Sequence, residues 1–293
     1  MNNSTTRESS KLGIGLCLMT ASIFGCSIVM AKLAYGYGMS PLTFGAARAF
    51  AGVVVCLGMA IALKSPWRLP PSASSEVLPI TFIFLMIAFG YPLAMKYIPA
   101  SIASLIFYLF PLIVLAIGSF KERRFPGIKR ILIYLTAFVG LGIVLGPSLE
   151  GLQWQGVVAG LVAAMGAALF TLKIPKIMSE TNGMVLNVYA NALNVVVLLG
   201  AAWAFDMFMF PSTPEGWLVA ALSGIFYGVA TAMVVFAVNK TGPALASIFF
   251  NVEPMVVAIL AALLFAEFLS LIQYMGMVIV VGALMFASLR SSR

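Results

Sequence analysis

The sequence contains no histidine, nine acidic residues and three cysteines. A chain without histidine cannot build a histidine-ligated haem, a histidine-based zinc hydrolase centre or a Ser-His triad. A pair of intramembrane catalytic aspartates is also excluded, because Glu253 is the one acid that falls deep within an apolar segment. Cys17, Cys26 and Cys56 lack metal-ligand spacing and are interpreted as packing residues. We therefore expect no enzymatic activity, no cofactor and no metal site.

Hydrophobic residues dominate instead. They make up 62% of the chain, against 9% charged residues, and the mean hydropathy is +1.08, which lies outside the range of soluble domains. The apolar segments have the length of about 20 residues that crosses a bilayer as a helix, and they lack the alternation of membrane β-strands. We predict an all-α, polytopic membrane protein with ten spans, at residues 12–34, 41–63, 77–97, 101–119, 130–147, 156–175, 184–205, 216–239, 243–265 and 271–289.

The net charge of +8 comes from basic residues that gather on one side of the predicted bundle. That side carries the polar tail 1–11 and the breaks around Lys64, Arg123 and Lys240. The positive-inside rule predicts that both termini are cytoplasmic, with 1–11 as a tail before a retained first helix. Because the basic residues are explained as a topology signal, we expect the lipid bilayer and no nucleic acid as the macromolecular partner.

One segment of the chain occurs twice in similar form. "SIASLIFYLFPLIVL" begins at Ser101, and "ALASIFFNVEPMVVA" begins at Ala244. Each copy belongs to a group of five predicted spans, and this odd number places the second copy upside down in the membrane. We predict two inverted five-helix repeats, with a duplication kept only for packing as the alternative to transport. The expected organisation is an N-terminal tail at 1–11, repeats at 12–147 and 156–289, an external linker at 148–155 and a C-terminal tail at 290–293.

Both copies of the repeated segment contain a proline near the middle of a span, at Pro111 and Pro254. Proline has no N–H, so the carbonyls of Phe107 and Phe250 lose their usual helical partner. Such carbonyls are costly in lipid unless protein, water or ligand satisfies them, and paired breaks at the midplane are typical of transporter binding sites. We interpret Pro111 and Pro254 as hinge or gating residues, with ordinary kinks as the alternative.

Three polar side chains are candidate substrate ligands. Glu253 precedes the second proline, and a charge at this depth costs at least about 2.5–3.5 kcal/mol. Glu253 is therefore expected to hold a substrate ammonium, carry a proton or pair with a base. Asn251, two residues earlier, is the second candidate, and Lys32 near the outer end of the first span is a candidate that snorkelling explains equally well.

Other polar residues in the spans are expected to be structural. Arg48, seven residues into the second span, is predicted to pair with backbone carbonyls rather than with substrate. Asn187, Asn191 and Asn194 share one helix face and are predicted to form packing hydrogen bonds across helices, with a polar cavity wall as the alternative.

Aromatic residues fall at the same depth as the two prolines. A set of such residues beside a few polar groups makes an apolar pocket suited to an amphipathic solute. The aromatic candidates for substrate binding are Phe107, Tyr108, Phe250, Tyr91 and Tyr227.

The twin segments "ASLIFYLFP" and "ASIFFNVEP" resemble the drug/metabolite transporter superfamily, in particular its ten-helix members with two EamA-type repeats. The second copy continues "FAEFLSLIQYMGMVIVVGALM", which is similar to the family's loop motif. Glu267, Gln273, Gly276 and Gly282 match that motif, while Ala266 replaces a glycine, and Glu122 alone is kept in the first copy.

Within the superfamily the chain looks most like the YddG-type exporters of aromatic and other neutral amino acids in the bacterial inner membrane. The resemblance implies alternating access around a central cavity, with the third, fourth, eighth and ninth spans as gates. We expect a monomer, with a dimer as the alternative. The alternatives left open are another small metabolite or drug as substrate, a passive channel, and a structural or sensor protein without flux.

Overall fold

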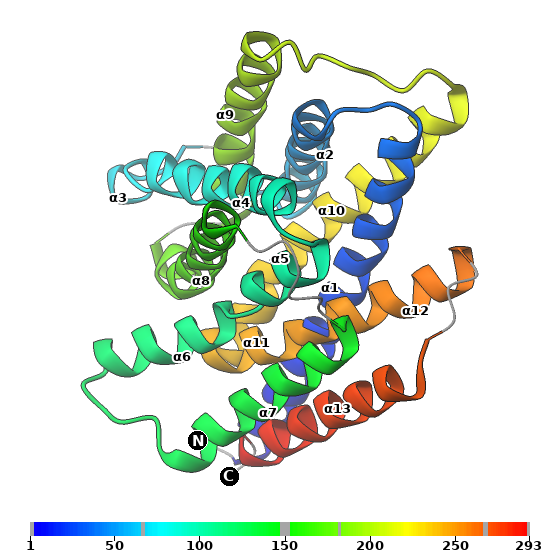
Figure 1. The fold of residues 1–293 in the computed structure, drawn as a ribbon. Coiled ribbons are helices and arrows are strands. Elements are labelled where there is room, and N and C mark those ends of the chain that lie inside the picture. The colour runs from blue at the N-terminus through cyan, green and yellow to red at the C-terminus, as the bar shows by residue number, and fades with distance from the viewer. Residues whose placement is uncertain (1–2, 66–67, 147–152, 181–182, 266–268, 292–293) are drawn as a thin grey trace.

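The computed structural model describes residues 3–65, 68–146, 153–180, 183–265 and 269–291 (Figure 1). Within these residues the regular structure is entirely helical. Ten helical segments are long and apolar enough to cross a membrane, from Leu12–Gly36 to Leu271–Leu289. The predicted all-α fold with ten membrane-length helices is therefore confirmed.

The helices are α1 (Asn3–Gly36), α2 (Pro41–Ala62), α3 (Pro71–Ser74), α4 (Val77–Tyr97), α5 (Ala100–Phe107), α6 (Phe110–Lys121), α7 (Ile128–Leu145), α8 (Trp154–Glu180), α9 (Gly183–Ala204), α10 (Pro214–Thr241), α11 (Pro243–Phe249), the 3-10 turn η1 (Phe250–Val252), α12 (Glu253–Phe265) and α13 (Leu271–Ser291). α1 continues through residues 3–11, which we expected as a separate tail. Of the expected linker 148–155 and C-terminal tail 290–293, residues 148–152 and 292–293 lie outside the described part of the chain.

Polar caps and glycines set the helix ends. Ser40 caps α2 by accepting a hydrogen bond from the Thr43 amide at 3.2 Å, and Thr213 caps α10 in the same way. A proline follows each cap, at the first helical position, where its missing N–H costs nothing. Gly146 ends α7 with a positive φ of 52°, which glycine adopts without steric cost.

Helix packing shows the inverted repeat directly. The first span (α1) packs along the eighth (α10), and the third (α4) packs along the sixth (α8), which are the same pair after the two repeats are exchanged. The second span packs on the seventh (α2 on α9) and the fifth on the tenth (α7 on α13), and these pairs map onto themselves. Figure 1 shows α1 beside α10 and α7 beside α13. The repeats are therefore interlocked rather than side by side.

Small residues permit the close crossings. A Cβ on Gly276 of α13 would lie 2.8 Å from the Gly140 carbonyl oxygen of α7. Between α1 and α10, Ser27 Oγ donates to the Ser223 carbonyl at 2.9 Å, and Ser223 Oγ donates to the Ser27 carbonyl at 2.8 Å. Close backbone approach and hydroxyl hydrogen bonds stabilise helix pairs where lipid offers no hydrophobic drive for association.

The fourth and ninth spans are each broken into two half-helices. α5 ends at Phe107 and α6 begins at Phe110, while α11 ends at Phe249 and α12 begins at Glu253 after η1. Pro111 lies in the first turn of α6, and Pro254 is the second residue of α12. A proline is tolerated there because the amides of a first turn have no helical acceptor.

The half-helices are packed differently on the two sides of the bundle. We call the side where α1 begins and α13 ends the N-face, and the opposite side the far face. At the N-face, α6 packs against α11. Towards the far face, α5 packs against α4, α7 and α8, whereas α12 packs mainly against α1. The structure is therefore closed at the N-face, while the two far halves rest on different neighbours.

Candidate functional site

An aromatic cluster surrounds the first break. The ring of Phe107 lies 5.3 Å from Tyr91 of α4, 5.4 Å from Tyr108 and 5.8 Å from Phe110, measured between ring centroids. The Tyr91 hydroxyl and Ser104 Oγ share a hydrogen bond of 2.6 Å. This cluster joins α4 to the α5–α6 break and presents several ring edges and faces at one place.

Glu253, the first residue of α12, faces this cluster from the second repeat. Its carboxylate is within electrostatic range of Tyr108 and Tyr91. Glu253 is partly buried. A charge of this kind inside a membrane bundle is expected to face a cavity or a partner, and Glu253 lies beside the Tyr108 side of the aromatic cluster.

Arg48 of α2 lies within electrostatic range of this acid. Its guanidinium carbon is 4.2 Å from the ring centroid of Tyr227 and 5.6 Å from that of Phe44. The Arg48 Nε is buried and has no hydrogen-bond partner in the described part of the chain. The predicted pairing of Arg48 with backbone carbonyls is not seen for this nitrogen; aromatic faces hold the guanidinium instead.

Arg48 and Glu253 interact through space and form no direct ion pair in the described part of the chain. Arg48 belongs to the first repeat and Glu253 to the second, and the aromatic side chains lie around both. A base, an acid and an aromatic wall are thus brought together where the half-helices meet.

The structure distributes the remaining predicted ligands differently. Tyr227 lies beside Arg48, because its ring contacts the guanidinium. Phe250 is 6% exposed and Asn251 3% exposed, and both lie in η1, which packs against α1. The Asn251 Oδ1 is buried and has no partner in the part of the chain that is described. Lys32 has an exposed side chain on α1.

Sequence reasoning missed aromatic residues at the far-face end of the site. Tyr35 stacks edge-on against Phe44 at 5.1 Å, and the Phe44 ring in turn contacts Arg48. Phe24 of α1 packs edge-on against Tyr227 at 6.0 Å. Tyr35 was overlooked because the first span was expected to end at residue 34, whereas α1 extends to Gly36.

The asparagine stripe on α9 also differs from expectation. Asn191 Nδ2 donates to the Asn187 carbonyl at 2.9 Å, and Asn194 Nδ2 donates to the Ala190 carbonyl at 3.1 Å. These bonds lie within α9, so for Asn191 and Asn194 the predicted hydrogen bonds across helices are wrong. The side chains are buried where α9 packs on α2, and we assign them no contact with the central site.

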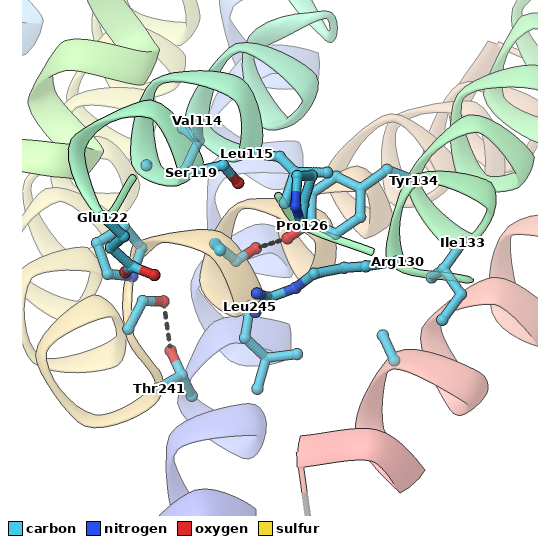
Figure 2. Close-up of a pocket in the computed structure, with 15 residues that line it drawn as sticks. Val114, Leu115, Ser119, Glu122, Pro126, Arg130, Ile133, Tyr134, Thr241 and Leu245 are labelled. Atoms are coloured by element: carbon cyan, nitrogen blue, oxygen red, sulfur yellow. Dashed lines mark hydrogen bonds between the residues drawn. The ribbon is translucent and has the colours of Figure 1, made fainter. Parts of the chain in front are cut away.

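A cavity of about 530 Å³ opens at the N-face, apart from the central cluster. It lies between α6, the start of α7 and the junction of α10 with α11, as Figure 2 shows. The Tyr134 hydroxyl, at its wall, donates a hydrogen bond to the Ala244 carbonyl. This bond and the packing of α6 on α11 separate the cavity from the centre of the bundle.

Comparison with known proteins gives one family and one fold. A profile of the EamA-like transporter family matches residues 11–146 and again residues 154–289. A solved structure described only as "Crystal structure of protein" superposes with a TM-score of 0.79 at 17% identity, over 98% of this chain and 99% of the other. That likeness concerns the fold alone. No curated protein matches the chain.

Proposed function

The chain belongs to the EamA-like transporter family, a part of the drug/metabolite transporter superfamily, whose domain it carries twice, and we propose that it is a secondary transporter of amino acids with aromatic or other apolar side chains. Membership of the family supports only the transport of small molecules across a membrane, so this substrate class is a narrower proposal. The proposal is carried by the opposed charges of Arg48 and Glu253 beside an aromatic wall.

A free amino acid has the charges that such a site requires. Its carboxylate fits the guanidinium of Arg48, which can donate two parallel hydrogen bonds and has an unpartnered Nε. Its ammonium fits the carboxylate of Glu253. Its side chain fits the rings of Tyr91, Phe107 and Tyr108. A ligand that satisfies both charges removes the cost of burying them unpaired.

We propose alternating access as the mechanism. The present conformation is closed at the N-face, where α6 packs on α11. The inverted repeat supplies a second arrangement, in which α5 would approach α12 while α6 and α11 separate. Pro111 lies in the first turn of α6 and Pro254 in the first turn of α12. In this scheme both prolines act as hinge residues at the breaks between half-helices. Bound amino acid would then be exposed to one face at a time.

The proposed direction of transport is export from a bacterial cytoplasm. Lys64, Arg123, Arg124 and Lys240 lie at the N-face ends of their helices, and the positive-inside rule assigns that face to the cytoplasm. The resemblance to YddG-type exporters supports both the direction and the preference for aromatic amino acids. In this orientation the far face is external, and the protein is a multi-pass protein of the inner membrane.

Counterflow in liposomes tests the proposal. Purified protein is reconstituted, unlabelled phenylalanine is loaded inside, and uptake of labelled phenylalanine is followed, with protein-free liposomes as the control. We expect saturable uptake that internal phenylalanine accelerates. Phenethylamine, which lacks the carboxylate, and phenylpropionate, which lacks the ammonium, should compete much more weakly than phenylalanine.

Three outcomes would contradict the proposal in different ways. Flux that does not saturate and shows no acceleration by internal substrate would indicate a passive channel. Equal competition by phenethylamine would remove the role of the carboxylate and point to a cationic drug or amine. Absence of uptake for every neutral amino acid, with folded protein, would leave another small metabolite as the substrate.

A further inference from the structure

The N-face cavity contains an acid and a base on opposite sides. Glu122 follows the last residue of α6, and Arg130 lies in the first turn of α7. Figure 2 shows the Arg130 side chain reaching across the cavity towards Leu245, with Glu122 on the other side. Neither residue takes part in an ion pair within the described part of the chain. The two charges are therefore both available to a ligand.

The rest of the lining is a mixture of apolar and hydroxyl groups. Apolar contacts come from Val114, Leu115, Ile133 and Leu245, and hydroxyls come from Ser119 and Thr241. The volume of about 530 Å³ falls within the range of about 300–1,000 Å³ that is usual for small-ligand pockets. A mid-sized solute that carries an ammonium, a carboxylate and an apolar body matches the chemistry of this lining.

The floor of the cavity is the closed gate. The Ala244 carbonyl accepts hydrogen bonds from the Tyr134 hydroxyl and from Ser247 Oγ, the latter at 2.9 Å. α6 and α11, which wall the cavity, are the half-helices that must separate before a solute at the N-face reaches Glu253. A ligand in the cavity thus lies directly in front of the gate.

We infer that this cavity is a second binding site for the transported amino acid, a vestibule in which Arg130 holds the carboxylate and Glu122 the ammonium before the gate opens. The inference rests on the proposed function. It repeats at the N-face the charge arrangement of Arg48 and Glu253, so that one amino acid chemistry is recognised at both sites.

Binding stoichiometry is the first test. Equilibrium dialysis with labelled phenylalanine is carried out on the purified full chain in detergent, with no zwitterionic lipid present. At a phenylalanine concentration that just saturates the wild type, we expect Arg130→Gln and Glu122→Gln, whose vestibule is weakened, to bind measurably less phenylalanine per chain than the wild type. Lys129→Gln removes a neighbouring exposed charge that does not line the cavity, and this control should match the wild type.

Transport from each face gives the second test. In liposomes with the orientation read from a cleavable N-terminal tag, Arg130→Gln should raise the KM for phenylalanine at the N-face by about five- to tenfold, as expected for one lost charge-assisted hydrogen bond. The KM for phenylalanine presented at the far face should stay unchanged. Equal KM changes at both faces, or no change at either, would overturn the inference.

The controls separate this inference from its premise. If the wild type transports phenylalanine but Arg130→Gln and Glu122→Gln keep its binding stoichiometry, the vestibule fails and the proposed function stands. If the wild type neither binds nor transports amino acids, the proposed function itself fails. A phosphatidylethanolamine headgroup carries the same two charges, so phosphatidylglycerol liposomes are used. An effect that appears only after phosphatidylethanolamine is added would assign the cavity to lipid and overturn the inference.

Discussion

At the scale of single residues, the central site depends on a guanidinium that aromatic rings hold in place. Arg48 rests on Tyr227 and Phe44 and keeps a buried Nε without a partner. Lysine cannot reproduce this arrangement, because its ammonium lacks the planar fork that stacks on a ring and binds a carboxylate with two hydrogen bonds. The identity of this base, and not its charge alone, should therefore set the affinity for the substrate carboxylate.

We expect Arg48→Lys and Arg48→Gln both to raise the KM for phenylalanine, by about tenfold or more, because a hydrogen bond to a charged group is worth about 1.5–3 kcal/mol. Inhibition by phenethylamine, which has no carboxylate, should change little. The measurement is counterflow with phenethylamine as competitor, and Arg68→Gln, an exposed base outside the site, is the control. An unchanged KM in Arg48→Gln would remove Arg48 from substrate binding.

At the scale of helices, α7 and α13 can cross closely because one position, Gly276, has no side chain. A Cβ on Gly276 would meet the Gly140 carbonyl oxygen and the Val144 amide nitrogen, each at 2.8 Å. Both atoms belong to backbone and cannot rotate away, so the helices would have to separate. Gly282, six residues along the same helix, has open space around its missing Cβ. The two glycines of one sequence motif thus have different roles.

We expect Gly276→Ala to lower the stability of the folded protein by about 1–3 kcal/mol, the usual cost of overpacking. Gly282→Ala should be neutral or slightly stabilising, because alanine favours the helix where nothing is displaced. Thermal unfolding in detergent, followed by circular dichroism, measures both variants. Equal melting temperatures for the two would contradict the close contact of α7 with α13.

The helices themselves were predictable from the sequence, and the contacts between them were less so. Span length and hydropathy located ten spans, because the bilayer sets the length of each helix independently of its neighbours. The repeated proline segments located the two breaks. The sequence did not predict that Arg48 lies over Tyr227, or that Asn191 bonds within its own helix. Such details depend on rotamers and on which helix faces which, and neither follows from hydropathy.

At the scale of the whole molecule, the Tyr134 hydroxyl is a contact that belongs to one conformation. It ties α7 to the start of α11 through the Ala244 carbonyl. If α6 and α11 separate to open the N-face, this bond is lost. Its net value is about 0.5–1.5 kcal/mol, enough to shift the balance of two conformations by about two- to twelvefold.

Tyr134→Phe should therefore increase the population that is open at the N-face. Ser247 is fully buried behind this gate, so the rate at which a Ser247→Cys thiol reacts with a membrane-impermeant reagent reports opening. The three native cysteines are first replaced by alanine. We expect faster labelling with Tyr134→Phe than without it, while Tyr189→Phe, at an exposed position, should have no effect. Unchanged labelling would mean that this hydroxyl does not hold the gate.

The interlocked pairing of the repeats also has a consequence for the order in which the protein is made. Ser27 and Ser223, which bond to each other, are 196 positions apart along the chain. At a synthesis rate of about 5–20 residues per second, Ser223 is added to the chain roughly 10–40 s after Ser27. During that time the first helix stands in the bilayer without the neighbour that covers it. Each half of the newborn protein is therefore incomplete until the ribosome has nearly finished, and a translation pause late in the message would lengthen the period in which the first half is exposed.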